Sequence, residues 1–208
     1  MLQTNTLEKS TLDLLKKLQK LPLLNELRLV GGTALALQIG HRRSIDLDFF
    51  GPVDAMGLQI VDEMYLSGIE DIVVIRDTRN IKIFMVNKVK VDIVSYRYNW
   101  LASPIEIDDV KLADIKDIAA MKLAAVTNRG TKKDFVDIYF LLQQFTIKQM
   151  MNLYEQKFTD GSIFNVIRSL TYFEDAEKDI MPEMYIPVDW TKVKQTVREA
   201  VIEFQGLL

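Results

Sequence analysis

Apolar and polar positions follow two different periods along the chain, and its first half mixes both. Leucines recur at helical spacing among lysines over residues 7–21, which predicts an amphipathic helix that ends before Pro22. A short apolar run at 27–30 predicts a strand that leads directly into Gly31 and Gly32.

The glycine pair is followed by a second predicted helix and by a strand with one acidic face. Residues 33–39 are strong helix formers, so we expect a helix capped by Thr33 and ended by Gly40. Strict alternation over 45–50 predicts a strand. Its apolar face, which we expect to enter the core, carries Ile45, Leu47 and Phe49.

Later patterns divide the chain into an α/β half and a helical half. The first half continues with a predicted helix at 54–66 and strands at 72–76, 81–86 and 89–96, the last two joined by an Asn87-Lys88 turn. Helices are predicted at 115–126, 132–145, 147–158, 162–173 and 190–204, with Thr131 and Thr146 as caps. The change of period lies within 97–109. We therefore expect an α+β fold, with an N-terminal mixed β-sheet and flanking helices over 1–98 and a C-terminal helical bundle over 99–208.

The composition limits the chemistry that the chain can perform. Its 208 residues include no cysteine and one histidine, which excludes thiol nucleophiles, disulfides, thiolate zinc sites and any site with two imidazoles. Catalysis must use carboxylates, lysines, arginines and hydroxyls. The N-terminal residues lack a basic-then-apolar leader, and we expect a cytoplasmic protein.

Charge is spread unevenly along the chain. The formal net charge of −3 argues against a protein that coats nucleic acid over its whole surface. Residues 111–133 nevertheless hold six basic residues against two acidic ones, which leaves room for a local basic patch. The acidic stretch at 174–189 is typical of a solvated face or a linker.

Asp46 and Asp48 share one face of the predicted strand at 45–50. Such a pair is tolerated when both carboxylates are exposed or when a divalent cation lies between them, and an isolated Asp-x-Asp pair favours a solvated strand face. Asp92 would share this face if the strand at 89–96 were a neighbour. Three carboxylates could then hold two magnesium ions roughly 3.5–4 Å apart, as in-line phosphoryl displacement requires.

The two glycines supply a second candidate feature. A helix that begins directly after them presents unobstructed backbone N–H groups and the positive end of its dipole, and both favour a triphosphate. The same glycines could instead serve only to make a tight turn.

The segment 29–50, LVGGTALALQIGHRRSIDLDFF, resembles the leading motif of the AbiEii/AbiGii toxin family of nucleotidyltransferases, within the DNA polymerase β-like superfamily. The double glycine, the His-Arg-x-Ser-x-Asp-x-Asp-Phe run and the separation between them carry this resemblance. A second stretch, KDIAAMK at 116–122 with RGTKKDFVDIY at 129–139, is similar to the family's helical segment after the sheet.

For the nucleotide, the resemblance implies that phosphates are held by Gly31, Gly32 and Thr33, with Arg42 and Arg129 as further nucleotide-binding residues. The superfamily pattern often has serine after the first glycine. Gly32 supplies only backbone here, so any hydroxyl contact falls to Thr33.

For the chemical step, the resemblance implies that Asp46 and Asp48 bind metal and that Asp92 is the third acid, a metal ligand and a base toward the acceptor hydroxyl. It also places Lys122 among the catalytic residues, where its ammonium would reach the phosphates.

Several basic residues keep two interpretations. Arg42 contacts the nucleotide or pairs with Asp46 or Asp134 to hold its loop, and Asp134 is either a structural acid or a late member of the site. Lys132 and Lys133 belong to a predicted nucleic-acid patch.

The resemblance thus implies an enzyme that uses Mg²⁺ or Mn²⁺ to move a nucleoside monophosphate from an NTP to a hydroxyl. It implies the toxin of a toxin–antitoxin or phage-defence pair, with an antitoxin protein as partner and an RNA, the 3′ end of a tRNA, as acceptor. A protein or small-molecule hydroxyl is an alternative acceptor. A catalytically silent fold that binds a nucleotide or a partner protein is the alternative from another class.

Overall fold

The chain forms two compact units in the computed structural model, which describes residues 1–206. The first unit comprises Met1–Tyr98 and Ser103–Ala113, and the second comprises Asn99–Ala102 and the chain from Asp114 onward. The boundary expected after residue 98 coincides with the first crossing between the units. Residues 103–113, expected in the helical domain, return to the first unit.

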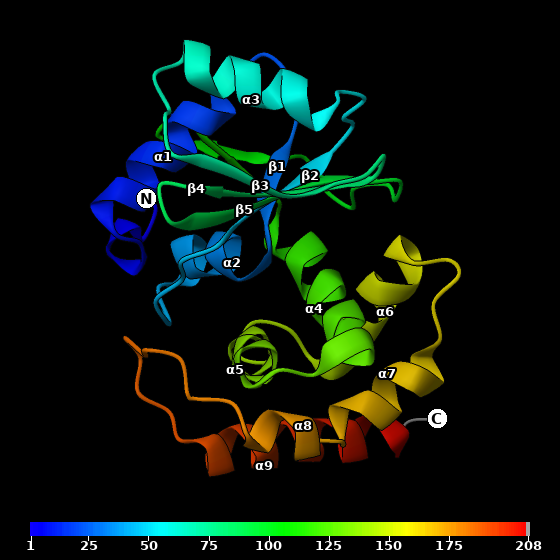
Figure 1. The fold of residues 1–208 in the computed structure, drawn as a ribbon. Helices are drawn as coiled ribbons and strands as arrows, with labels where there is room; N and C mark the ends of the chain where they lie inside the picture. Colours follow the sequence, from blue (N-terminus) through cyan, green and yellow to red (C-terminus); the bar gives the residue numbers. More distant parts are fainter. Residues whose placement is uncertain (207–208) are drawn as a thin grey trace. The chain divides into compact units, whose positions relative to one another are not determined.

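Seven strands of the described residues form one mixed sheet in the first unit (Figure 1). The strand order is β3-β4-β5-β2-β1-β7-β6, with parallel pairing between β2 and β5 and between β1 and β7. The strands are β1 (Arg28–Val30), β2 (Leu47–Gly51), β3 (Ile72–Asp77), β4 (Ile81–Val86), β5 (Val89–Ser95), β6 (Ile105–Ile107) and β7 (Val110–Leu112). The mixed sheet predicted from the sequence is confirmed.

The helices of the first unit cover the sheet on both faces, with α3 on one side and α2 on the other (Figure 1). Their bounds are η1 (Thr4–Thr6), α1 (Lys9–Gln19), α2 (Gly31–Ile39) and α3 (Gly57–Leu66). The strands between them alternate as predicted. Leu47 and Phe49 of β2 are fully buried, as are Val91 and Ile93 of β5, so these strands present their acidic residues to the opposite face.

Two predictions about the glycine helix and the acidic strand are wrong. Helix α2 begins at Gly31, with Val30 at the N-cap position, so Thr33 lies inside the first turn and is not the cap. Ile45 is 60% exposed because β2 begins only at Leu47. The alternation at Ile45 belongs to the preceding loop and has no structural meaning.

Two tight hairpins hold residues with positive φ. Asn87 and Lys88, between β4 and β5, have φ of 49° and 66°, which fits the predicted two-residue turn without glycine. Asp108 and Asp109, between β6 and β7, have φ of 54° and 63°. Strand β6 lies within 97–109, where the sequence predicts only the change of period, and β7 follows directly after this region.

The second unit is helical, as predicted for the C-terminal half. Its helices are α4 (Ile115–Arg129), α5 (Lys132–Leu141), α6 (Ile147–Lys157), α7 (Ile163–Leu170), α8 (Glu174–Glu177) and α9 (Trp190–Gln205). Thr131 occupies the N-cap position of α5, and Thr146 caps α6 in a capping box with Gln149. Among residues 1–206, no helix is long and apolar enough to span a membrane.

Candidate active site

Two acidic residues lie side by side on neighbouring central strands of the sheet in the first unit. Asp48 of β2 and Asp92 of β5 are direct partners in the parallel pairing of these strands. Both alternate with buried apolar residues, so their carboxylates lie on the same face of the sheet. Strands β2 and β5 are therefore neighbours, which is the condition under which Asp92 was expected to share the face of Asp48.

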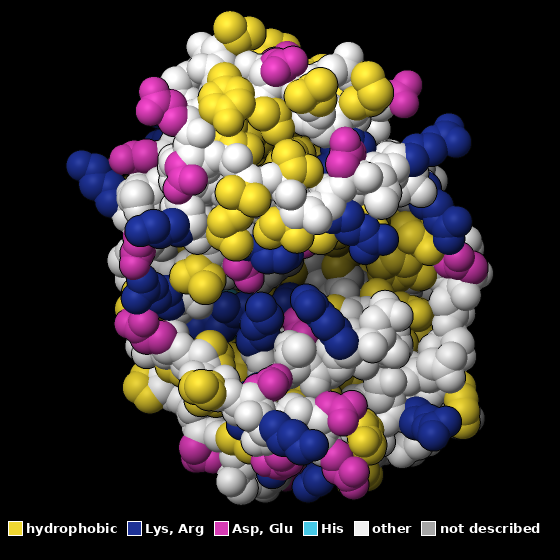
Figure 2. All heavy atoms as spheres, viewed as in Figure 1, with side chains coloured by type: hydrophobic (Ala, Val, Ile, Leu, Met, Phe, Trp, Pro, Cys, Tyr) yellow, Lys and Arg dark blue, Asp and Glu magenta, His cyan; other side chains and the backbone are white. Residues whose placement is uncertain are grey.

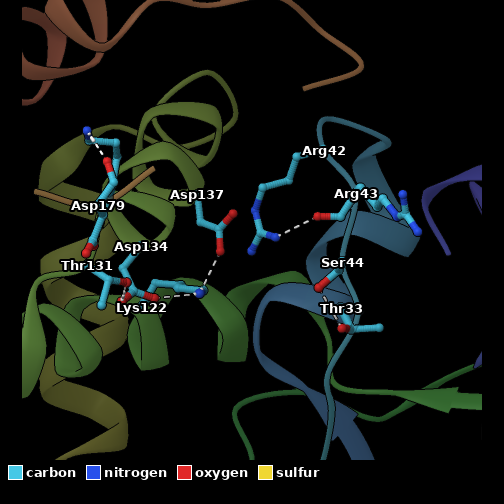
Figure 3. A network of polar contacts seen from close by, with 10 residues as sticks. Thr33, Arg42, Arg43, Ser44, Lys122, Thr131, Asp134, Asp137 and Asp179 are labelled. Carbon is cyan, nitrogen blue, oxygen red and sulfur yellow. Dashed lines mark hydrogen bonds and ion pairs between the residues drawn. The ribbon is translucent and has the colours of Figure 1, made fainter. Parts of the chain in front are cut away.

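Asp46 is two positions before Asp48 and is the last residue before β2. It is half-buried, and its backbone carbonyl accepts a hydrogen bond from the Thr33 hydroxyl. This contact and a 2.8 Å hydrogen bond between Thr33 Oγ1 and Ser44 Oγ fix the loop that leads into the acidic strand (Figure 3).

Asp92 has a cation beside it in its own strand. The Lys90 ammonium lies 2.5 Å from both carboxylate oxygens of Asp92, because residues two apart in a strand share a face. In residues 1–206, no group of three acidic or histidine side chains is close enough to hold a metal ion. The third acid is thus on the expected face, but its charge is balanced by a lysine.

The chemistry of this donor set fits a hard divalent cation. Asp46, Asp48 and Asp92 offer only oxygen atoms, all three residues are half-buried, and Mg²⁺ prefers oxygen ligands. A metal bound to all three acids would take the place that the Lys90 ammonium occupies beside Asp92.

Gly31 is required where the glycine helix meets Asp48. Its φ is +69°, and a Cβ atom there would lie 2.6 Å from Asp48 Oδ2. Both the backbone conformation and the close approach exclude a side chain at this position. The sequence alone could not distinguish this from a simple tight turn.

The start of α2 therefore offers backbone donors next to the Asp48 carboxylate. Gly31, Gly32 and Thr33 form its first turn, and their N–H groups have no acceptor within the helix. Such a helix start attracts anions. The predicted phosphate-binding residues and Asp48 are brought together in one place.

Arg42 is buried, and its guanidinium donates a 3.0 Å hydrogen bond to the Arg43 carbonyl within the same loop (Figure 3). This contact shapes the basic loop between α2 and β2. The pairing of Arg42 with Asp46 or Asp134 and its contact with the nucleotide both stay predictions.

In the second unit, Lys122 forms a buried cluster with two aspartates (Figure 3). Its ammonium lies 2.9 Å from Asp134 Oδ1 and 2.6 Å from Asp137 Oδ2. Burial raises the pKa of Asp134, but the Lys122 charge and a hydrogen bond from Thr131 outweigh it and bring this pKa below its ordinary value. We call Lys122, Thr131, Asp134 and Asp137 the buried lysine cluster.

From the sequence, Lys122 and Asp134 are separate candidates, and no link between them or with Asp137 is predicted. The available signal was the i, i+3 spacing of Asp134 and Asp137, which puts both carboxylates on one side of α5.

A second buried ion pair was missed altogether. Lys157 of α6 and Asp117 of α4 are fully buried, with Nζ 2.6 Å from Oδ1. Asp117 also accepts hydrogen bonds from the N–H groups of Leu101 and Ala102, and Lys157 donates to the Asn99 carbonyl. This pair fastens the segment Asn99–Ala102 to the helices.

The basic stretch at 111–133 does not form one surface patch. Lys111 belongs to the first unit. Lys132, a predicted nucleic-acid contact, is buried, and its ammonium donates to the carbonyl oxygens of Glu177 and Asp179. It therefore anchors the acidic segment after α7 and is not available to RNA. Arg129 and Lys133 are exposed.

Residues 13–208 match the family described as nucleotidyl transferase AbiEii toxins of type IV toxin–antitoxin systems, and the chain belongs to this family of enzymes. The family resemblance stated from the sequence is confirmed.

The chain is also similar to individual proteins. An uncharacterized protein of Aquifex aeolicus is 33% identical over 207 residues, covering 95% of this chain and 97% of the relative. JHP933 of Helicobacter pylori has a similar fold, with a TM-score of 0.56, 19% identity and coverage of 96% and 92% of the two chains. MenT4, a nucleotidyltransferase toxin of Mycobacterium tuberculosis, gives a TM-score of 0.56 and 18% identity, covering 89% of this chain and 80% of its own.

Proposed function

We propose that this nucleotidyltransferase moves a nucleoside monophosphate from an NTP to a hydroxyl of an RNA, the 3′ end of a tRNA, with Mg²⁺ or Mn²⁺. The observation that carries the proposal is the strand register that sets Asp48 opposite Asp92, on a sheet face that Gly31 leaves open. The enzyme acts in the cytoplasm as a toxin held in check by a cognate antitoxin protein.

The reaction needs one bond formed and one broken at the α-phosphorus. The acceptor oxygen bonds to that phosphorus, the bond to the bridging oxygen of the β-phosphate breaks, and pyrophosphate leaves with both bonding electrons. The hydroxyl proton passes to a carboxylate, the role proposed for Asp92. A divalent metal bound to the acids would lower the pKa of the acceptor hydroxyl and neutralise phosphate charge.

The remaining residues have binding roles in this proposal. The N–H groups of Gly31, Gly32 and Thr33 receive the phosphate oxygens, since they start a helix and lack intrahelical acceptors. Arg42 lies in the next loop and is proposed to bind the same nucleotide.

In the second unit, Lys122 is proposed to serve the phosphates, which requires its ammonium to exchange a carboxylate partner for a phosphate oxygen. Arg129 is proposed to contact the nucleotide and Lys133 the RNA backbone. Both are exposed.

The acceptor is identified by labelling. The purified protein is incubated with total tRNA, MgCl₂ and each of the four α-³²P-labelled NTPs in turn, and products are separated on a denaturing gel after digestion with ribonuclease or protease. The proposal predicts label in tRNA, lost after ribonuclease treatment. Label that survives ribonuclease but not protease would identify a protein hydroxyl as the acceptor. The absence of label from both RNA and protein would exclude transfer to RNA.

One observation favours a catalytically silent nucleotide-binding module as a second candidate. The Lys90 ammonium already neutralises Asp92, so an enzyme must exchange it for a metal, whereas a silent module could keep it. The two candidates differ in whether the acids bind metal at all.

Mn²⁺ binding, followed by electron paramagnetic resonance, separates these candidates without an activity readout. In the enzyme, Lys90→Met removes a competing cation and tightens Mn²⁺ binding several-fold. Lys88 is an exposed lysine in the adjacent turn, so Lys88→Met is the matched control and leaves Mn²⁺ binding unchanged. A protein that binds no Mn²⁺ with either residue at position 90 would support the silent module.

A further inference from the structure

Strand β3 is an edge of the sheet with an apolar and exposed outer side. It ends the strand order of the first unit, and no other strand within residues 1–206 pairs with its outer side. Val73, Val74 and Ile75 are 55%, 50% and 54% exposed. Proteins usually protect such edges with charge or cover them, because an open apolar edge is a template for another strand.

The helix that precedes β3 continues this apolar surface. Leu58, Tyr65 and Leu66 of α3 are exposed, and hydrophobic side chains gather over α3 in the upper part of Figure 2. Helix α3 lies on the sheet beside β3, since Gly57 N donates a 3.1 Å hydrogen bond to Asp77 Oδ2. Exposed apolar surface of this extent marks an interaction site.

A β-bulge sets which charges of the strand share a face. Val73 is opposite Met85 and Arg76 is opposite Ile83, with a register shift between Val74 and Arg76. Met85 and Ile83 are two apart in β4 and share a face, so Val73 and Arg76 also share one. Asp71, two residues before Val73, lies on that face too.

The backbone pattern shows which residues of β3 offer hydrogen bonds outward. Asn87 N donates a 2.8 Å hydrogen bond to the Asp71 carbonyl, so Asp71 directs its backbone groups toward β4. Hydrogen-bonded and non-hydrogen-bonded positions alternate in an antiparallel ladder. Ile72 and Val74 therefore direct their N–H and C=O groups away from the sheet, and Val73 does not.

We propose that β3 pairs antiparallel with β3 of a second copy of this chain, about a two-fold axis that passes beside Val73. Ile72 then hydrogen-bonds to Val74 of the second copy, and the reverse, using the backbone groups that face outward. Val73 lies opposite its own copy, and one sheet continues through both subunits. This inference does not depend on the proposed catalytic function.

Charge complementarity argues for a second copy over an unrelated strand. In this register the bulged Ile75 is skipped, so Asp71 of each subunit lies opposite Arg76 of the other, on the face shared with Val73. The segment 71–76 carries one acid and one base at its two ends with only apolar residues between them. Antiparallel self-pairing thus neutralises both charges and pairs Ile72 with Val74 on the opposite face.

The strand alone is too short for a stable interface. Specific interfaces bury at least about 1,000 Å² in total, so the exposed apolar residues of α3 must contribute in each subunit. We expect a dimer that dissociates on dilution.

Sedimentation and charge reversal test the pairing in solution. The full chain is expected to sediment as a dimer at about 100 µM and to dissociate at lower concentration. Asp71→Arg or Arg76→Asp alone places like charges opposite each other twice and weakens dimerisation about tenfold or more. The double variant Asp71→Arg/Arg76→Asp restores both ion pairs and recovers dimerisation, which a merely misfolded single variant would not explain.

A disulfide reports the register, because the chain has no cysteine of its own. Val73→Cys is expected to form a dimer under mild oxidation, since directly opposed non-hydrogen-bonded positions bring the two Cβ atoms close. Ile75→Cys is the matched control, on the same strand and equally exposed, and is expected to cross-link far less.

Three outcomes would overturn the proposal. These are a monomer at about 100 µM, a double charge reversal no better than the single ones, or equal cross-linking at positions 73 and 75. A monomeric chain that instead takes up another protein along β3 would assign this edge to a different partner.

Discussion

Gly31 and Asp48 depend on each other at the scale of single residues. A left-handed backbone at Gly31 lets the Asp48 carboxylate lie against the first turn of α2, where a Cβ would be 2.6 Å from its Oδ2. Gly31→Ala is expected to lower the free energy of unfolding by about 1–3 kcal/mol and to abolish nucleotide transfer, because either the glycine or the carboxylate must move. Urea denaturation and tRNA labelling measure the two effects.

Gly68 provides the matched control for this prediction. Its φ is +72°, but nothing lies within 4 Å of an added Cβ. Gly68→Ala should therefore show only the backbone cost, about 1–2 kcal/mol, with transfer unchanged. Equal loss of transfer in both variants would contradict the role assigned to the approach of Asp48.

The buried lysine cluster makes the stability of the second unit depend on pH. The folded-state pKa of Asp134 lies below its ordinary value, so its ionised form stabilises the fold above the unfolded pKa of about 4. This contribution is lost as the pH falls from about 4 toward the lower folded pKa. The melting temperature should drop through this range in the wild type.

Asp134→Asn removes that pH dependence but lowers the free energy of unfolding near neutral pH. Since Lys122 loses one of its two buried carboxylates, we expect about 3 kcal/mol of destabilisation at pH 7. Below pH 4, the melting temperature should depend less on pH than it does in the wild type. Glu155→Gln, exposed on α6, serves as control. An unchanged acid profile in Asp134→Asn would show that other groups govern it.

Single-residue environments were the part of the site least visible in the sequence. The acids Asp48 and Asp92 could be predicted because alternation fixes the face of a strand residue. Lys132 could not, since a lysine after a cap residue looks solvated, and its burial depends on the distant carbonyls of Glu177 and Asp179. Tertiary hydrogen bonds of this kind have no local signature.

At the scale of elements, two-residue hairpins position the strands that carry the acids. The turn between β4 and β5 holds Asn87 and Lys88 at positive φ, where glycine at the second position is preferred. Lys88→Gly is expected to raise the free energy of unfolding by about 0.5–1 kcal/mol, measured by urea denaturation. Val89→Gly, one residue into β5, should lower it instead, and a destabilised Lys88→Gly would contradict the turn geometry.

The length of each strand explains whether the sequence predicted it. Strands β4 and β5 were visible because each is a run of six or seven residues rich in β-branched and other apolar side chains. Strands β6 and β7 have three residues each, which is too few to show a period. They are stabilised by pairing with each other and with β1, contacts that are set by the whole sheet.

At the scale of the whole molecule, the proposed transfer to tRNA requires exposed basic side chains that contact RNA phosphates, and Lys133 is one such exposed residue. Lys133→Ala should weaken tRNA binding at low salt and reduce its salt dependence by about one counterion. Lys132→Ala should instead destabilise the second unit, because this ammonium is buried. Unchanged affinity in Lys133→Ala would remove Lys133 from the RNA path.

The central claim is that Asp48 and Asp92 act together in nucleotide transfer. The most direct measurement is the initial rate of labelling of tRNA by Asp48→Asn and by Asp92→Asn, with the exposed Asp62→Asn as control and circular dichroism to verify folding. The account predicts that each of the first two variants loses about a thousandfold in rate, while the control keeps the wild-type rate. A folded Asp92→Asn protein that labels tRNA at the wild-type rate would contradict it.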